Sequence, residues 1–115
     1  MKLYGIPNCG TVKKARAWLA EHAQEVAFHD FKKAGVDAAW LRGVIAQTGW
    51  PALLNTRGTT WRRLSDAEKA SITDEASAIA LMVAQPSVIK RPVLEREGRY
   101  HLGFAEPQYR AIFGV

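Results

Sequence analysis

The first thirty residues of the chain carry the pattern of a strand, a helix and a second strand. Residues 2–6 and 26–29 are short apolar runs, and between them residues 11–22 place apolar side chains at helical spacing. The inward stripe of this helix is expected to hold Val12, Ala15, Leu19 and Ala23, with Trp18 alongside. One helix between two such strands predicts a right-handed crossover that leaves the strands parallel. The expected fold class is therefore α/β.

The middle of the chain predicts helices. Asp37 can cap a helix that ends at Gly49, and its inward face is expected to hold Leu41, Val44, Ile45 and Thr48. Residues 55–60 are polar and predict a loop, and Ser65 begins the capping-box pattern of a short helix. A further helix is expected to begin at residue 73 or 74 and to bury Ala76, Ile79, Ala80 and Val83.

The last part of the chain returns to strands. Residues 88–89 and 93–95 are strand-like, and Glu97-Gly98 predicts a hairpin turn into residues 100–102. Pro107 suits the first turn of a final helix that faces inward with Tyr109, Ile112 and Phe113. This order predicts a small mixed sheet flanked by helices, with an all-helical insertion at about residues 36–86, in a single domain of 115 residues.

Size and composition exclude several classes of protein. No apolar run approaches the roughly 20 residues that span a bilayer, so no membrane association is expected. The opening residues lead straight into a strand without a cleavable apolar segment, which makes a cytoplasmic location the default expectation. The single cysteine cannot form an internal disulfide, in agreement with a reducing compartment.

The net charge of +5 comes from 16 Lys and Arg against 11 Asp and Glu, without a basic tail or block. A mild excess of this kind is typical of a solvated surface, so direct nucleic-acid binding is not expected. An anionic small molecule or an acidic partner fits the charge equally well.

Cys9 lies where the first strand runs through a turn into the first helix. Free N–H groups at a helix N-terminus stabilise an anion such as a thiolate, so Cys9 is a candidate nucleophile. Lowering a thiol pKa from 8.5 to 6.5 requires about 2.7 kcal/mol, whereas a helix end supplies about 0.3–1 kcal/mol, so cationic side chains are expected to contribute the rest. The alternative is that Cys9 is a small buried hydrophobe.

Two arginines fall in expected loops and can supply that charge. Arg57 lies in Asn-Thr-Arg-Gly, and Arg91 directly precedes Pro92 at the start of a strand, where the peptide bond is a candidate for the cis form. Guanidinium groups bind oxyanions and carboxylates through paired donors. Each arginine has the alternative of being only a surface cation.

Other chemistry finds little support in the sequence. The three histidines, His22, His29 and His101, show no ligand spacing and have no cysteine partners, so no metal site is expected. Gly5 and Gly10 match the spacing of neither the dinucleotide fingerprint nor the P-loop.

Three segments together resemble the arsenate reductase-like ArsC/Spx family. They are Tyr-Gly-Ile-Pro-Asn-Cys-Gly-Thr-Val-Lys-Lys-Ala at 4–15, Asn-Thr-Arg-Gly at 55–58 and Lys-Arg-Pro-Val at 90–93. They occur in the family's order, so the similarity covers nearly the whole chain. The resemblance implies a thioredoxin-like (glutaredoxin-like) fold with a helical insertion.

The resemblance also implies roles for particular residues. Cys9 is similar to the cysteine that attacks arsenate or accepts a mixed disulfide, Arg57 and Arg91 resemble the arginines that hold the anion and stabilise the thiolate, and Pro92 resembles the family's cis-proline. The anion-binding or glutathione-binding loop would then be formed by Asn8, Gly10, Thr11 and Val12.

The chain departs from the family's patterns at two positions. Val12 occupies the second position of the Cys-x-x-Cys of Spx-type switches, so an oxidised Cys9 must be resolved by an external thiol. Glutathione is the natural co-substrate, with glutaredoxin as a possible partner and no tightly bound cofactor. Phe104 stands where glutaredoxin-coupled arsenate reductases have a further arginine, with Arg99 nearby in sequence.

The sequence therefore favours a glutathione-dependent thiol oxidoreductase of arsenate reductase type, which acts on an oxyanion or a disulfide. Two alternatives stay open. One is an Spx-type RNA polymerase-binding transcriptional regulator without a redox switch, and the other is a protein that binds glutathione or a glutathionylated partner without turnover.

Overall fold

A computed structural model of residues 1–115 contains one mixed sheet of four strands in the order β2-β1-β3-β4. The strands are β1 (Lys2–Gly5), β2 (Ala27–Asp30), β3 (Val93–Arg96) and β4 (Arg99–Leu102). β1 runs parallel to β2 and antiparallel to β3, and β3 forms an antiparallel hairpin with β4. The predicted parallel crossover and the α/β class are confirmed.

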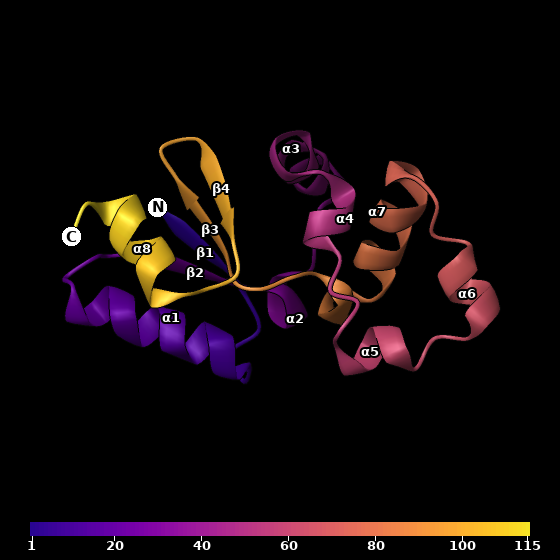
Figure 1. Ribbon diagram of the computed structural model, residues 1–115, viewed down its shortest axis with the longest axis horizontal. Coiled ribbons are helices and arrows are strands. Elements are labelled where there is room, and N and C mark those ends of the chain that lie inside the picture. Colours follow the sequence, from indigo (N-terminus) through magenta and orange to yellow (C-terminus); the bar gives the residue numbers. More distant parts are fainter. The chain divides into compact units, whose positions relative to one another are not determined.

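The chain divides into two compact units. The first unit combines residues 1–30 with residues 91–115 and contains the sheet, α1 (Gly10–Glu21) and α8 (Glu106–Phe113). The second unit, residues 31–90, is helical (Figure 1). The segment expected to be an all-helical insertion, about residues 36–86, lies within this second unit.

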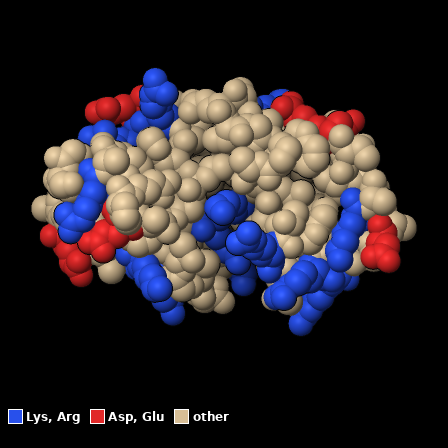
Figure 2. All heavy atoms as spheres, in the orientation of Figure 1, with Lys and Arg blue, Asp and Glu red and all other residues tan.

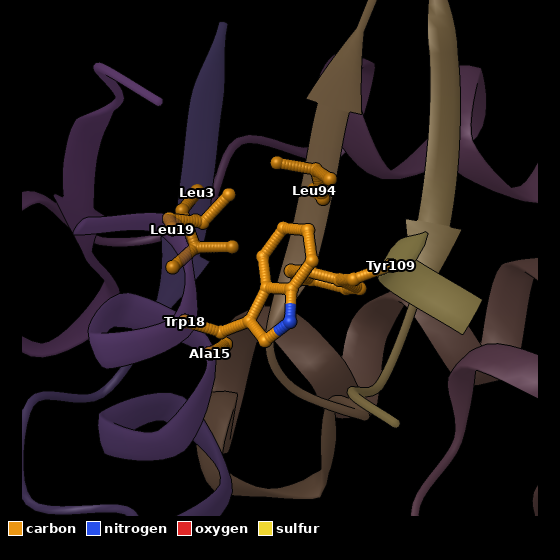
Figure 3. Close-up of a cluster of buried hydrophobic side chains, with 6 residues drawn as sticks. All are labelled: Leu3, Ala15, Trp18, Leu19, Leu94 and Tyr109. Atoms are coloured by element: carbon orange, nitrogen blue, oxygen red, sulfur yellow. The ribbon is translucent and has the colours of Figure 1, made fainter. Parts of the chain in front are cut away.

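The core of the first unit lies between one face of the sheet and its two helices (Figure 3). Leu3 of β1 and Leu94 of β3 are register partners, so their side chains share that face. The buried cluster consists of Leu3, Ala15, Trp18, Leu19, Leu94 and Tyr109. Trp18 of α1 meets the ring of Tyr109 edge to face at a centroid distance of 5.5 Å, which ties α1 to α8.

Two short turns explain where the elements of the first unit end. Glu97 and Gly98 have φ angles of 53° and 77°, which confirms the predicted hairpin turn. Ala23 has a φ of 54°, lies beyond the end of α1 and is exposed, so its predicted place in the inward stripe is wrong. The chain has already left the helix at that residue and turns back toward β2.

The helices of the second unit are mostly short. They are α2 (Phe31–Ala34), α3 (Ala38–Thr48), α4 (Trp50–Leu53), α5 (Thr59–Arg62), α6 (Asp66–Ala70), α7 (Glu75–Ala84) and the 3₁₀ turn η1 (Pro86–Val88). The Asp37 side chain accepts a hydrogen bond from the N–H of Ala39, and Ser65 forms the capping box with Glu68, as predicted. The loop predicted at residues 55–60 ends earlier, because α5 begins at Thr59.

The buried face of α7 differs from the prediction. Ala78 and Met82 are fully buried, whereas Ala76, Ala80 and Val83 are exposed. The helix is apolar around most of its circumference, so spacing alone did not select the face that packs. α7 packs against α3, and that contact fixes the face.

A short antiparallel ladder closes the second unit. Leu54 and Ile89 form a β-bridge, the N–H of Asn55 donates to the carbonyl of Val88 at 2.7 Å, and the N–H of Lys90 donates to the carbonyl of Leu53 at 2.7 Å. The segment predicted as strand-like at residues 88–89 is thus partly the 3₁₀ turn and partly this bridge. The ladder holds the end of the second unit beside the loop that follows α4.

The core of the first unit contains a hydroxyl without a hydrogen-bond partner. The Tyr109 side chain is fully buried, and its hydroxyl oxygen forms no hydrogen bond. Because an unsatisfied buried hydroxyl costs about 1–3 kcal/mol, Tyr109→Phe is expected to raise the free energy of unfolding by about 1 kcal/mol. Urea denaturation at pH 7 measures this change, and a loss of stability in the variant would show that the hydroxyl is satisfied.

The same residue predicts an alkaline limit to stability. Burial raises the pKa of Tyr109 above its ordinary value, so the folded state retains this proton after the unfolded chain has lost it. The contribution of Tyr109 to the free energy of unfolding is therefore fully present below about pH 10 and is lost as the pH rises further. In Tyr109→Phe the alkaline loss should be smaller but not absent, because burial and Glu95 also raise the pKa of Tyr100.

Candidate functional site around Cys9

Cys9 is the residue that precedes the first turn of α1. Its backbone is extended, with φ −87° and ψ 128°, and its carbonyl accepts the first helical hydrogen bond, from the N–H of Lys13 at 2.9 Å. The Cys9 N–H donates back to the carbonyl of Ile6, which closes the turn that follows β1. The thiol is free and only partly buried, so the alternative that Cys9 is a buried core residue is not what the structure shows.

The surroundings of the thiol favour its ionised form. Burial raises the pKa of Cys9, but the backbone N–H groups of Val12 and Thr11 lower it, and so do the charge and a hydrogen bond of the Arg91 guanidinium. The net result is a pKa below the ordinary value.

Arg91 is distant from Cys9 in the sequence but belongs to the same unit. It precedes Pro92 through a cis peptide bond, as the sequence predicted, and β3 begins directly afterwards. The Pro92 carbonyl accepts a hydrogen bond from the N–H of Gly103 at 2.8 Å, which anchors the segment to the end of β4. Because β3 pairs with β1, Arg91 is carried to the end of β1 where Cys9 lies.

Gly5 allows β1 and α1 to approach closely beside the thiol. A Cβ atom at this position would lie 2.9 Å from a methyl carbon of Val12, inside contact distance, and 3.8 Å from the Cβ of Arg91. Val12 is fully buried and β-branched, so its side chain has little freedom to move away. The close packing at the start of α1 therefore explains the glycine at position 5.

The remaining residues of the predicted binding loop surround the sulfur in different ways. Asn8, Gly10 and Thr11 are exposed, whereas Val12 contributes its N–H to the site and its side chain to the core. A role of this loop in binding glutathione or an oxyanion stays a prediction. Lys13 and Lys14 are exposed on α1, as expected of lysines that point away from the thiol.

Arg57 belongs to the second unit. It is exposed and lies in the loop after α4, where its N–H donates to the side-chain oxygen of Asn55 at 3.2 Å. Together with Asn55 and Lys90 it lines a surface pocket of about 290 Å³. The predicted action of Arg57 on the Cys9 thiolate therefore stays a prediction, and Lys90 is a pocket residue that the sequence reasoning missed although it stands next to Arg91.

Phe104, which the resemblance places where some family members have a further arginine, is partly buried and packs against the core cluster of the first unit. Its ring packs edge to face on Tyr109 at a centroid distance of 4.6 Å. Arg99 lies in β4 and is exposed.

Metal and membrane features are limited. No group of three or more His, Cys, Asp and Glu side chains is arranged to hold a metal ion. No helix is both long enough and apolar enough to cross a membrane. Figure 2 shows acidic side chains among the basic ones on the visible face, as expected of a mildly basic surface.

The fold and the free cysteine at the start of α1 define a thioredoxin-like protein of the arsenate reductase-like class. The profile of the ArsC family matches residues 4–112, so the chain belongs to the ArsC family. A solved structure described as a YffB protein is similar to it, with 54% identity, a TM-score of 0.91 and 96% of each chain covered.

Two further comparisons bear on function. The solution structure of an arsenate reductase (ArsC) related protein from Brucella melitensis shares 48% identity with a TM-score of 0.78, and the match covers 99% of this chain and 94% of that one. A global transcriptional regulator Spx from Streptococcus pyogenes is 30% identical over 96% of this chain and 82% of its own length. Both branches suggested by the sequence are thus represented among the relatives.

Proposed function

We propose that the protein is a glutathione-dependent thiol oxidoreductase of arsenate reductase type, with Cys9 as its nucleophile. The observation that carries the proposal is the partly exposed Cys9 thiol, whose pKa is lowered, against the effect of burial, by the N-terminus of α1 and by Arg91. A thiolate that is accessible and stabilised in this way is suited to attack sulfur or an oxyanion. The similarity to an arsenate reductase related protein supports the same class.

The proposed reaction reduces a mixed disulfide between a target thiol and glutathione. The Cys9 thiolate attacks the glutathione sulfur, a new S–S bond forms to Cys9, and the old S–S bond breaks with its electron pair on the target sulfur, which takes a proton from water. A second glutathione thiolate then attacks the glutathione sulfur on Cys9, which releases oxidised glutathione and restores the Cys9 thiolate.

Each protein group has a defined task in this scheme. Arg91 and the N–H groups of Thr11 and Val12 stabilise Cys9 both as the attacking thiolate and as the leaving group. Val12 offers no second thiol, so the donor must come from outside the chain. A disulfide is a better candidate substrate than arsenate because Phe104 packs in the core in place of a further arginine.

The test is the pH dependence of Cys9 alkylation by iodoacetamide, alone and with glutathione or arsenate present. The alkylation rate should rise with a midpoint below the ordinary thiol pKa of about 8.5, because the folded site favours the thiolate. Glutathione should slow the reaction by occupying the site. A midpoint at about 8.5 that neither ligand changes would contradict the proposal.

The similarity to Spx supports a second candidate, a regulator that docks on RNA polymerase and does not use Cys9. This candidate predicts that polymerase binding is measurable and is unchanged by Cys9→Ser. A pull-down of purified RNA polymerase with the wild-type chain and with that variant separates the two functions.

A further inference from the structure

The peptide group between Leu102 and Gly103 links α8 to the segment that carries Arg91. Its N–H donates to the carbonyl of Pro92 at 2.8 Å, and its carbonyl accepts a hydrogen bond from the side-chain nitrogen of Gln108 at 3.0 Å. Both polar groups of this one peptide are therefore bonded. A rotation of the peptide plane would break the two bonds together.

The Leu102–Gly103 peptide lies at the end of the hairpin, where the sheet holds the backbone less firmly. The last register pair of the hairpin is Val93 with Leu102, so the next residues along would pair Pro92 with Gly103. Such a pair normally exchanges two hydrogen bonds, but proline has no N–H and only one can form. Gly103 also has a φ angle of 73° and no side chain to restrict it. The bond from Gln108 therefore supplies a restraint that the sheet does not.

The Gln108 side chain is itself fixed at two points. Its oxygen accepts the N–H of Ala105 at 3.1 Å, while its nitrogen donates to the carbonyl of Leu102. Only one orientation of the amide satisfies both partners, since an N–H must meet the oxygen and a carbonyl must meet the nitrogen. Gln108 is partly buried in the first turn of α8, so the helix holds the amide in place.

Pro92 passes this restraint on to Arg91, to which it is directly bonded. Because the proline ring fixes its own φ angle, few backbone torsions separate the held carbonyl from Arg91. The Cβ of Arg91 lies close to the end of β1, where a Cβ added to Gly5 would be 3.8 Å from it. From this position the guanidinium forms its hydrogen bond with Cys9, and such a bond weakens steeply when its geometry changes.

We propose that Gln108 is a positioning residue that keeps Arg91 beside the Cys9 thiol. It does so by holding the Leu102–Gly103 peptide, whose N–H in turn holds the carbonyl of Pro92. The inference deepens the proposed function and rests on it, because the thiol that Arg91 serves is the proposed nucleophile. Loss of the Gln108 amide should therefore reduce the thiolate fraction at Cys9, and not only the stability of the fold.

The first test is Gln108→Met, which removes both hydrogen bonds of the amide and adds no charge. Methionine is of similar length and favours helices, so α8 should form. Hydrogen exchange measured by NMR should be at least about tenfold faster at the Gly103 N–H, while the amides between β1 and β3 stay protected. Alkylation of Cys9 by iodoacetamide should be about threefold slower at pH 7, and the two rates should converge at high pH.

Three further variants, assayed at about 0.15 M salt, separate positioning from charge and from helix stability. Gln108→Glu keeps an acceptor for the Ala105 N–H but loses the donor to Leu102, so it should also slow alkylation. Ala111→Glu adds the same charge at an exposed position of α8 and should leave the alkylation profile unchanged. Glu106→Gln removes the exposed ion pair of α8 and should leave the profile unchanged as well.

The outcomes separate this inference from the proposed function. Wild-type exchange at Gly103 in Gln108→Met, or faster exchange with an unchanged alkylation profile, would overturn the inference and leave the thiol chemistry intact. Equal effects of Gln108→Met and Glu106→Gln would overturn it too, since helix stability would then be the cause. Slower alkylation in Gln108→Met, together with no effect of glutathione on the wild-type chain and no turnover, would support the inference and overturn the reductase.

Discussion

In Cys9→Ser, the rate at which glutathione reduces a mixed disulfide is expected to fall to the background rate, a loss of at least about 10³-fold. The chain has no second cysteine that could take over the attack, and a serine hydroxyl is not ionised at neutral pH. The proposed cycle requires the same sulfur twice, first as nucleophile and then as leaving group. A coupled assay that follows oxidised glutathione measures the loss.

The substitution is conservative in shape, so the fold should survive it. Cys9 is only partly buried and forms no disulfide, and serine is favoured at the position before a helix. Circular dichroism and the unfolding midpoint should therefore match the wild type. Turnover that persists in a correctly folded Cys9→Ser chain would rule out the thiol mechanism.

Arg91→Met is expected to move the pH profile of Cys9 alkylation to higher pH and to slow alkylation several-fold at pH 7. Burial raises the pKa of Cys9, and the Arg91 guanidinium is one of the groups that lower it, through its charge and a hydrogen bond. Without the guanidinium, a smaller fraction of Cys9 is thiolate at neutral pH. At a pH well above both pKa values the two rates should converge, since the thiol is then ionised in either protein.

Two further variants make the Arg91 result specific. Arg91→Lys keeps a positive charge without the paired donors of guanidinium and should lie between the wild type and Arg91→Met. Arg99→Met removes an exposed cation of β4 in the same unit and should leave the profile unchanged. Equal shifts in Arg91→Met and Arg99→Met would mean that overall charge, and not the position of Arg91, sets the pKa of Cys9.

Local signals in the sequence were sufficient for much of the fold. Asp37 and Ser65 mark the starts of α3 and α6 because the hydrogen bonds of a cap involve only neighbouring residues. Glu97-Gly98 marks its hairpin for a similar reason, since the turn itself requires positive φ angles. The cis bond before Pro92 was also expected from its place at the start of a strand.

Features that depend on packing between distant segments could not be predicted from local signals in the sequence. The buried face of α7 is selected by α3, and the apolar residues around α7 left that choice open. The pocket beside Arg57 exists because Lys90 pairs with Leu53, which is distant in sequence. For the same reason the position of Cys9 could be predicted from its own segment, whereas its proximity to Arg91 required the pairing of β1 with β3.

Val12 is fully buried at the position where a second cysteine would be needed for an internal disulfide with Cys9. Its methyl groups fill the space left by Gly5, and the position that could have held a partner sulfur is given over to packing. The chain therefore has no way to store an oxidation as an internal disulfide. In the proposed cycle, the redox state of Cys9 would accordingly be set by thiols outside the chain.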